Sequence, residues 1–207
     1  MRTTVFLVRH GETDYNIEGR IQGASDFSAL THHGARQAEM LRERLRKEKF
    51  NVMYSSPLRR AMETAHMLRP KGLDILTDDG LRERSFGELE GKTWEEVGRE
   101  KPGLHEEYRA TRELPGVGGA ESSGEMHKRV WECFRRMVLE NPGKRILVVT
   151  HGGFIAMVMA MITKTPIESR DRFQNDNCSV TVINYDDEDK AFNAEKFNDT
   201  SHLEAEI

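Results

Sequence analysis

An arginine and a histidine, Arg9 and His10, stand together directly after an apolar stretch, and Gly11 follows them. Such side chains are costly to bury at the end of an apolar segment unless something pairs with them, so they are candidate binding groups. A second histidine, His151, also follows an apolar stretch and also precedes a glycine. If the two stretches are neighbouring strands, the two imidazoles lie together. That juxtaposition is the central structural prediction.

Both histidines follow segments that have the composition of buried strands. Residues Thr3–Val8 are β-branched, aromatic or leucine, and they are too few for a core helix. Residues Lys144–Thr150 repeat the pattern before His151. Ligands of open α/β sheets bind at the carboxyl ends of the strands, where both His-Gly pairs would lie.

Two further arginines, Arg59 and Arg60, are predicted to open a helix that also begins at a strand end. The apolar residues that follow have helical spacing: Leu58, Ala61, Met62, Ala65 and Leu68. Cations in a first helical turn oppose the helix dipole, and an anion bound there would compensate. The ordinary alternative is a pair of solvated surface arginines. Helical direction alone does not choose between the two arginines.

A carboxylate, Glu83, lies between two arginines in the segment Leu81–Gly87. One interpretation is a surface salt-bridge cluster. The functional interpretation is a carboxyl group that is held near a cationic pocket and donates a proton.

Together these groups have the composition that phosphoryl transfer requires. Arginine forks donate to phosphate oxygens. A neutral imidazole can attack phosphorus, an imidazolium can hold charge, and a carboxyl group can protonate the leaving oxygen. The candidate catalytic residues are Arg9, His10, Arg59, Glu83 and His151. The site would need no metal, because the arginines and a histidine supply the positive charge.

Two other interpretations compete with phosphoryl transfer. A metal site made of His10, His151 and Glu83 resembles the two-histidine, one-carboxylate arrangement, but arginines in the same pocket would repel a divalent cation. Alternatively, both His-Gly turns are structural, with each histidine satisfied in the core. That interpretation suits one such turn better than two turns with arginines nearby.

The order of elements predicts an α/β fold, because strands and helices alternate along most of the chain. We expect a three-layer α/β/α sandwich around a mostly parallel sheet with an antiparallel edge strand. Further strands are expected at Phe50–Tyr54, Leu73–Leu76, Ser179–Tyr185 and, at the edge, Ala191–Phe197. Helices are expected after Thr31, at Leu58–Leu68, after Thr93, at Pro102–Arg112, at Met126–Val138 and at Phe154–Ile162.

Length and composition limit the classes of function. With 207 residues, the chain is expected to form one domain, residues 1–207, in which the irregular segment 86–123 is a lid and specificity region. A net charge of −4 gives no electrostatic basis for nucleic-acid binding, and no apolar run approaches the roughly 20 residues that span a membrane. Two cysteines and no room for a signal peptide predict a cytoplasmic protein. Both a monomer and a homodimer remain open.

Four motifs, in order, resemble those of the histidine phosphatase superfamily, the phosphoglycerate mutase-like proteins. They are Arg9–Thr13, with Asn16 and Gln22-Gly23 after it, then Ser55–Ala65, Leu81–Gly87 and Val149–Gly153. The resemblance covers nearly the whole chain. Within the superfamily, the sequence looks most similar to the alpha-ribazole phosphatase and broad-specificity phosphatase branch.

The resemblance implies a role for each residue. His10 would accept the phosphoryl group, and Glu83 would donate the proton. The phosphate pocket would consist of Arg9, Asn16, Gln22, Gly23, Arg59, His151 and Gly152. Arg60 has the weaker claim of the two arginines in the second motif. No cofactor and no metal are expected, and the partner is a small phosphorylated substrate.

Departures from the family's mutases favour a phosphatase. Cofactor-dependent phosphoglycerate mutases have a longer, more basic insert after the glutamate motif and usually a His-Tyr-Gly where this chain has Ser85-Phe86-Gly87. The prediction is therefore a histidine acid-type phosphatase that hydrolyses small phosphomonoesters, with water discharging phospho-His10. The alternative is a cofactor-dependent phosphoglycerate mutase. A non-catalytic phosphate-binding module is less favoured, since every expected reactive residue is present.

Overall fold

A computed structural model describes residues 1–203, so the last four residues of the predicted domain lie outside the described residues. The strands are β1 (Arg2–Arg9), β2 (Val52–Ser55), β3 (Ile75–Thr77), β4 (Arg145–Thr150), β5 (Val180–Asp186) and β6 (Ala191–Asp199). The α-helices are α1 (Asp14–Ile17), α2 (His32–Leu45), α3 (Arg59–Leu68), α4 (Trp94–Glu100), α5 (Leu104–Thr111), α6 (Ser123–Leu139) and α7 (Gly152–Ile162). Short 3₁₀ helices cover Asp79–Leu81, Gly87–Leu89 and Ile167–Phe173.

The six strands of the described chain form one sheet in the order β3-β2-β4-β1-β5-β6. Strands β1, β2, β3 and β4 pair in parallel, whereas β5 pairs antiparallel with both β1 and β6. The mostly parallel sheet is therefore confirmed, and β6 lies at one edge of it with β3 at the other. The strand that runs against the others is β5, one place inside the β6 edge.

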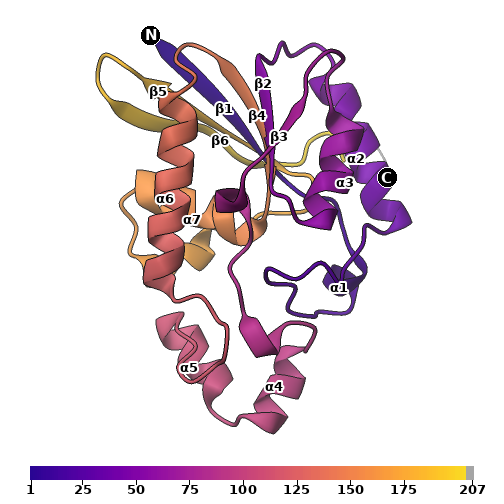
Figure 1. Cartoon of the computed structure of the whole chain (residues 1–207), viewed down its shortest axis with the longest axis vertical. Coiled ribbons are helices and arrows are strands. Elements are labelled where there is room, and N and C mark those ends of the chain that lie inside the picture. The colour runs from indigo at the N-terminus through magenta and orange to yellow at the C-terminus, as the bar shows by residue number, and fades with distance from the viewer. Residues whose placement is uncertain (204–207) are drawn as a thin grey trace.

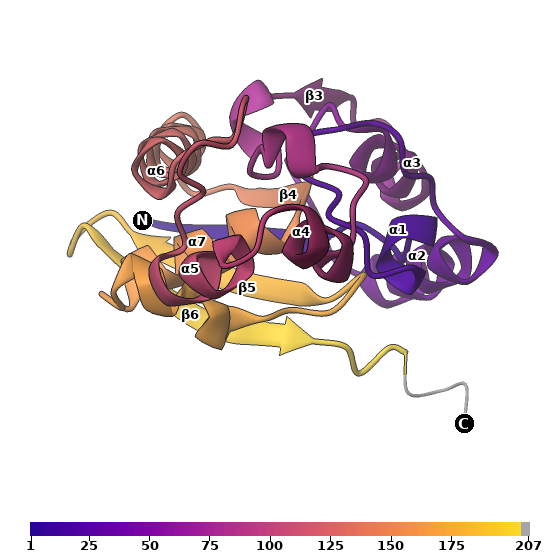
Figure 2. The ribbon, with the colours of Figure 1, turned by 90° about the horizontal axis from the view of Figure 1, so that it is seen from below.

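Helices cover both faces of the sheet, which confirms the three-layer sandwich. Figure 1 shows α6 and α7 on one side of the strands and α2 and α3 on the other, and Figure 2 shows the layers from below. Alternation along β1 explains the two cores, because successive strand residues point to opposite faces. Val5 and Leu7 pack with α6 and α7, and Phe6 and Val8 pack with α2 and α3.

Each predicted strand and helix is present, with ends that local chemistry moves by a few residues. Helix α6 begins at Ser123, before the predicted Met126, because Ser122 and Glu125 form a capping box. Helix α5 is shorter than predicted. It is bounded by Gly103 and Arg112, both of which have positive φ and so cannot continue a right-handed helix.

The segment 86–123 forms a separate layer beyond the carboxyl ends of the parallel strands, at the lower end of Figure 1. It has a small apolar core of its own, which is composed of Ile21, Leu89, Val97, Leu104, Leu114 and Val117. Ile21, from the loop after α1, joins this core and so ties that loop to α4 and α5. The segment predicted as a lid therefore packs against the loop that the first motif leads into.

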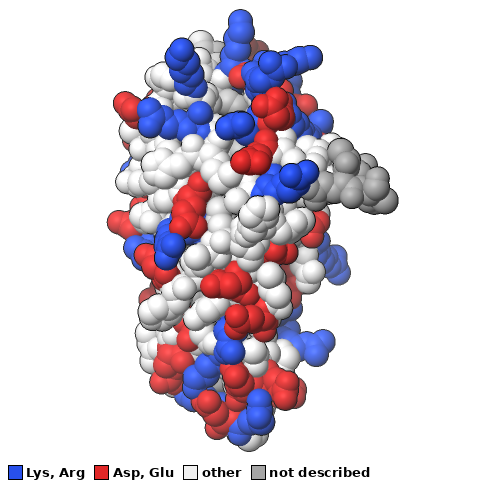
Figure 3. Space-filling model, turned by 90° about the vertical axis from the view of Figure 1, so that its right-hand side faces the viewer, with Lys and Arg blue, Asp and Glu red and all other residues white. Residues whose placement is uncertain are grey.

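The surface of the described chain carries both signs of charge. Figure 3 shows lysine and arginine interspersed with aspartate and glutamate over one face, including the end formed by α4 and α5. None of the helices in the described residues has both the length and the apolar character needed to cross a membrane.

Candidate active site

The two histidines meet because β1 and β4 are adjacent parallel strands. Arg9 lies in register with Thr150, and the His10 amide donates to the Thr150 carbonyl over 3.0 Å. The ring centroids of His10 and His151 are 5.3 Å apart, and the rings are tilted by 58°. The central prediction from the sequence is therefore confirmed.

The His10 ring has a defined tautomer. Its Nδ1 lies 2.8 Å from the carbonyl oxygen of Gly11, and because a carbonyl only accepts, Nδ1 carries the proton. Nε2 is therefore left with its lone pair. Burial lowers the pKa of His10 well below 6.5, and the neighbouring Arg60 and Arg9 lower it further. His10 is thus a neutral imidazole whose ring reaches the cavity described below.

The turn after His10 requires glycine at position 11, because the backbone there packs closely against α2. A Cβ at Gly11 would lie 2.6 Å from the carbonyl oxygen of Gly34 in α2. The Gly11 amide donates to the Thr64 hydroxyl over 3.0 Å, and Thr64 in turn donates to the Arg60 carbonyl. The turn after His10 is therefore fixed against two helices.

Two arginines flank His10, of which Arg9 is half-buried and Arg60 is buried. Arg9 donates through Nη1 to the Asn175 carbonyl. Arg60 donates to the carbonyls of Ser25 and Gly23 over 2.9 and 2.7 Å. Burial lowers the pKa of Arg60 to about 10, although Glu83 opposes that shift. The Nε atoms of both arginines are buried and have no acceptor among residues 1–203, so each keeps an unpaired donor beside the cavity that both residues line.

The structure corrects the sequence prediction for Arg59. Its side chain is exposed, pairs with Glu63 one helical turn later at 2.7 Å, and does not line the cavity. Arg60, which had the weaker claim, is 1% exposed and does line it. The physical reason is the phase of α3, since Arg60 shares the buried side of the helix with Ala61 and Thr64.

Glu83 receives two backbone hydrogen bonds. Its carboxylate accepts from the amides of Arg84 at 2.8 Å and Gly153 at 2.9 Å. A Cβ at position 153 would lie 2.2 Å from the Glu83 Oε1 atom, so only glycine allows this approach. Gly153 lies two residues after His151, which ties the carboxylate to the end of β4.

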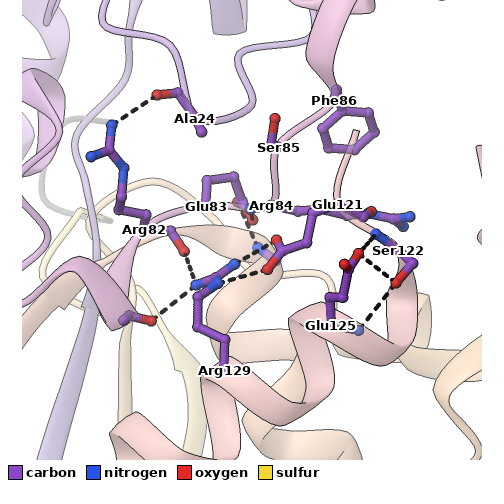
Figure 4. Close-up of polar contacts among 12 residues, drawn as sticks. Ala24, Arg82, Glu83, Arg84, Ser85, Phe86, Glu121, Ser122, Glu125 and Arg129 are labelled. Carbon is purple, nitrogen blue, oxygen red and sulfur yellow. Dashed lines mark hydrogen bonds and ion pairs between the residues drawn. The ribbon is translucent and has the colours of Figure 1, made fainter. Parts of the chain in front are cut away.

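Figure 4 shows what holds the Glu83 segment in place. Arg129 of α6 donates to both carboxylate oxygens of Glu121 at 2.7 Å and to the carbonyls of Arg82 and Gly80 at 2.9 Å. One half-buried guanidinium thus joins α6, the start of the Glu83 segment and the end of segment 86–123.

These groups open into a cavity of about 750 Å³, which is within the usual range for a small-molecule site. Its described lining contains more positive than negative side chains: Arg9, Arg20, Arg60, Arg84, Arg109, Arg112 and Arg170 against Glu83, Asp171 and Asp176. The whole chain has a net charge of −4, whereas the charged side chains that line this cavity are mostly positive. The cavity is built to receive an anion.

The remaining predicted phosphate-binding residues divide into two groups. Gln22, Gly23 and Gly152 line the cavity. Asn16 does not, because its carboxamide caps α1 by accepting from Thr13. His151 is fully buried beneath the cavity and next to His10.

Sequence reasoning missed four further arginines that line the cavity, which we call the outer arginines: Arg84, Arg109, Arg112 and Arg170. Arg84 is 2% exposed and donates to the carbonyls of Glu121 and Arg112. Arg170 is also buried. Arg112 pairs with Asp171, so it bridges the end of α5 and the 3₁₀ helix Ile167–Phe173. The position of Arg84 beside Glu83 was a usable signal, whereas nothing in the sequence around Arg170 pointed to a site.

Aromatic rings form another part of the wall. Trp94 stacks on His105 at 4.7 Å and on Tyr108 at 4.8 Å, and all three side chains line the cavity. All come from segment 86–123, which was predicted to determine specificity.

Comparison with known proteins agrees with this geometry. The model of the histidine phosphatase superfamily (branch 1) matches residues 5–200. The chain is 36% identical over 204 residues to phosphoglycerate mutase-like protein 4 of Arabidopsis thaliana, covering 97% of this chain and 86% of that protein. It is 33% identical to a metal-independent phosphoserine phosphatase of the same plant, with coverages of 97% and 83%. The alpha-ribazole phosphatase of Shigella flexneri superposes with a TM-score of 0.86 at 25% identity and covers 97% of each chain.

Proposed function

This chain belongs to branch 1 of the histidine phosphatase superfamily, and we propose that it hydrolyses small phosphomonoesters through a phosphohistidine on His10. The observation that carries the proposal is the free Nε2 atom of a neutral His10 in a cavity lined by arginines. A neutral imidazole with an available lone pair is the form that attacks phosphorus.

The proposed reaction has two steps. The His10 Nε2 atom attacks phosphorus, the bond between phosphorus and the ester oxygen breaks, and Glu83 gives its proton to that oxygen. Glu83 then takes a proton from water, which attacks phospho-His10 and releases inorganic phosphate. Arg9 and Arg60 donate to the phosphoryl oxygens throughout, which stabilises the charge that phosphoryl transfer concentrates there.

The direct test is phosphate release from a panel of phosphomonoesters in the presence of EDTA. We expect hydrolysis to continue at the same rate with and without the chelator, because arginines provide the positive charge. Loss of activity in EDTA that a divalent metal restores would contradict this mechanism and support the metal site. Failure to release phosphate from any ester would argue against the phosphatase.

Replacing Glu83 with glutamine should slow esters with poor leaving groups far more than esters with good ones. A poor leaving oxygen depends on a proton from the acid, and the glutamine has no proton to give. We expect a loss of about 10²- to 10⁴-fold for an alkyl phosphate and a much smaller one for p-nitrophenyl phosphate. Equal losses for both esters would show that Glu83 is not a general acid.

The outer arginines favour a second candidate function, a phosphoglycerate mutase. A mutase must hold a second anionic group of its substrate, and these arginines line the same cavity as His10. The substrate in the name of the phosphoserine phosphatase relative also carries a carboxylate, so the same arginines suit a phosphatase of phosphorylated acids. Formation of 2-phosphoglycerate from 3-phosphoglycerate, dependent on a bisphosphoglycerate primer, would identify the mutase.

Replacing Arg170 with glutamine is expected to reduce the preference for a substrate with a second anion. The matched pair is 3-phosphoglycerate and glycerol 3-phosphate, which differ by a carboxylate in place of a hydroxymethyl group. A hydrogen bond to a charged group accounts for roughly 10- to 100-fold in kcat/KM, so the ratio between the two esters should fall by about that factor. As a control, Arg99→Gln removes an equal charge from α4 outside the cavity and should leave the ratio unchanged. An unaltered ratio in Arg170→Gln would remove this arginine from substrate recognition.

A further inference from the structure

A buried serine, Ser56, contacts the second histidine. Its hydroxyl oxygen lies 2.8 Å from the Nε2 atom of His151, and neither residue is exposed. Ser56 directly follows β2, and its amide donates to the Val149 carbonyl of β4 at 2.9 Å. The ends of two neighbouring strands therefore fix the position of this contact.

The hydrogen bonds of the hydroxyl determine its direction. The Ser56 oxygen already accepts from the Leu58 amide at 3.3 Å. A buried hydroxyl also has one proton to donate, and in the described chain its single acceptor is the His151 Nε2 atom. The Ser56 hydroxyl therefore donates to Nε2, which requires the proton of a neutral His151 to be on Nδ1.

We propose that Ser56 is a positioning residue that holds His151 as the neutral Nδ1–H tautomer, so that this ring acts on the phosphoryl group as an uncharged hydrogen-bond donor. The His151 Nδ1 atom is buried and has no acceptor within residues 1–203. It is the one donor that the ring retains, on a ring 5.3 Å from that of His10. The consequence for catalysis rests on the proposed function, whereas the tautomer itself does not.

The charges around His151 favour an uncharged ring. Arg9 faces it from the end of β1, His10 from the turn after that strand, Arg60 from α3 and Arg129 from α6, and the Glu83 carboxylate is bound two residues away at Gly153. Burial lowers the pKa of His151 well below 6.5, and the three arginines lower it further. The sequence predicted an imidazolium in the site. In this proposal the arginines supply the positive charge instead, and the neutral His151 supplies an N–H donor.

The tautomer can be measured by NMR on protein labelled with ¹⁵N-histidine. Two-bond correlations between ring protons and ring nitrogens distinguish a protonated from an unprotonated nitrogen, and loss of signals in His151→Gln identifies this ring. We expect wild type at neutral pH to show a protonated Nδ1 and an unprotonated Nε2. A protonated Nε2 in wild type would overturn the proposal, whatever the activity.

Variants of Ser56 then test the cause. Ser56→Ala should lose the strict tautomer and reduce kcat by about 10- to 100-fold, since a ring that presents a lone pair to phosphate repels it. Ser56→Thr keeps the hydroxyl and should restore both the tautomer and most of the rate. Ser55→Ala is the matched control, because that equally buried hydroxyl donates to the Ser56 carbonyl and does not touch the imidazole.

The outcomes separate the two proposals. An unchanged His151 tautomer in a folded Ser56→Ala would refute the role of the hydroxyl. If Ser56→Ala does not fold, the wild-type and Ser56→Thr spectra decide the question. Absence of phosphate release from the wild-type enzyme would count against the phosphatase while leaving the tautomer measurement valid.

Discussion

Alanine at position 10 is expected to reduce phosphate release by on the order of 10⁴-fold or more, because the variant has no atom that can accept the phosphoryl group. The arginines would still bind substrate, so the KM should change much less than kcat. Steady-state release of inorganic phosphate measures this loss. Rapid quenching with ³²P-labelled substrate should in addition show an acid-labile protein-bound phosphate in wild type and none in His10→Ala.

Controls separate loss of the nucleophile from loss of structure. His32→Ala removes an exposed imidazole at the start of α2, outside the cavity, and should leave the rate unchanged. Thermal unfolding of His10→Ala should remain cooperative, since Gly11, which makes the turn, is retained. Substantial turnover by a folded His10→Ala, with no labelled protein in wild type, would exclude the phosphohistidine route.

The sequence predicted those parts of the fold and site that depend on local pattern. The apolar runs before His10 and His151 predicted two buried strands, and the two imidazoles were expected to meet if those strands are neighbours. A parallel pairing then brings the two rings together automatically, because the strands end at the same edge of the sheet.

The site residues that the sequence did not predict depend on contacts between segments that are distant in the chain. Arg170 lines the cavity because part of the segment after α7, from Arg170 to Asp176, contributes to the cavity wall. Ser56 contacts His151 only because β2 lies beside β4. Neither residue carries a local signal of these contacts.

The prediction that Arg59 rather than Arg60 belongs to the phosphate pocket was wrong for a different reason. In this case the sequence did contain a signal that distinguishes the two arginines. Arg59 and Glu63 are four residues apart on a helix, a spacing that favours a surface ion pair. Arg60 has Thr64 at the same spacing and Ala61 beside it, so it belongs to the face that packs inward. Helical phase, read from these partners, identifies the buried arginine.

This correction gives a prediction with a built-in control. Replacing Arg60 with methionine, which retains much of the buried volume, should lower kcat/KM by about 10²- to 10³-fold. The guanidinium holds the loop carbonyls of Ser25 and Gly23 and has an Nε donor that no described residue accepts. Arg59→Met removes the same charge one residue earlier in the chain and should change kcat/KM by less than roughly 2-fold, because that side chain is exposed and paired with Glu63.

Competitive inhibition by inorganic phosphate shows whether the loss concerns phosphate binding. The inhibition constant for phosphate should rise strongly in Arg60→Met and hardly at all in Arg59→Met, since of these two arginines only Arg60 lines the cavity. Because Arg60 also fixes the loop at residues 23–25, Arg60→Lys separates the two roles of the guanidinium. A lysine keeps the charge but cannot bind two carbonyls in the same fork, so its recovery should be partial. If Arg59→Met were instead the damaging change and Arg60→Met harmless, α3 would have to be rotated about its axis relative to the cavity, and the phosphate pocket described above would be wrong.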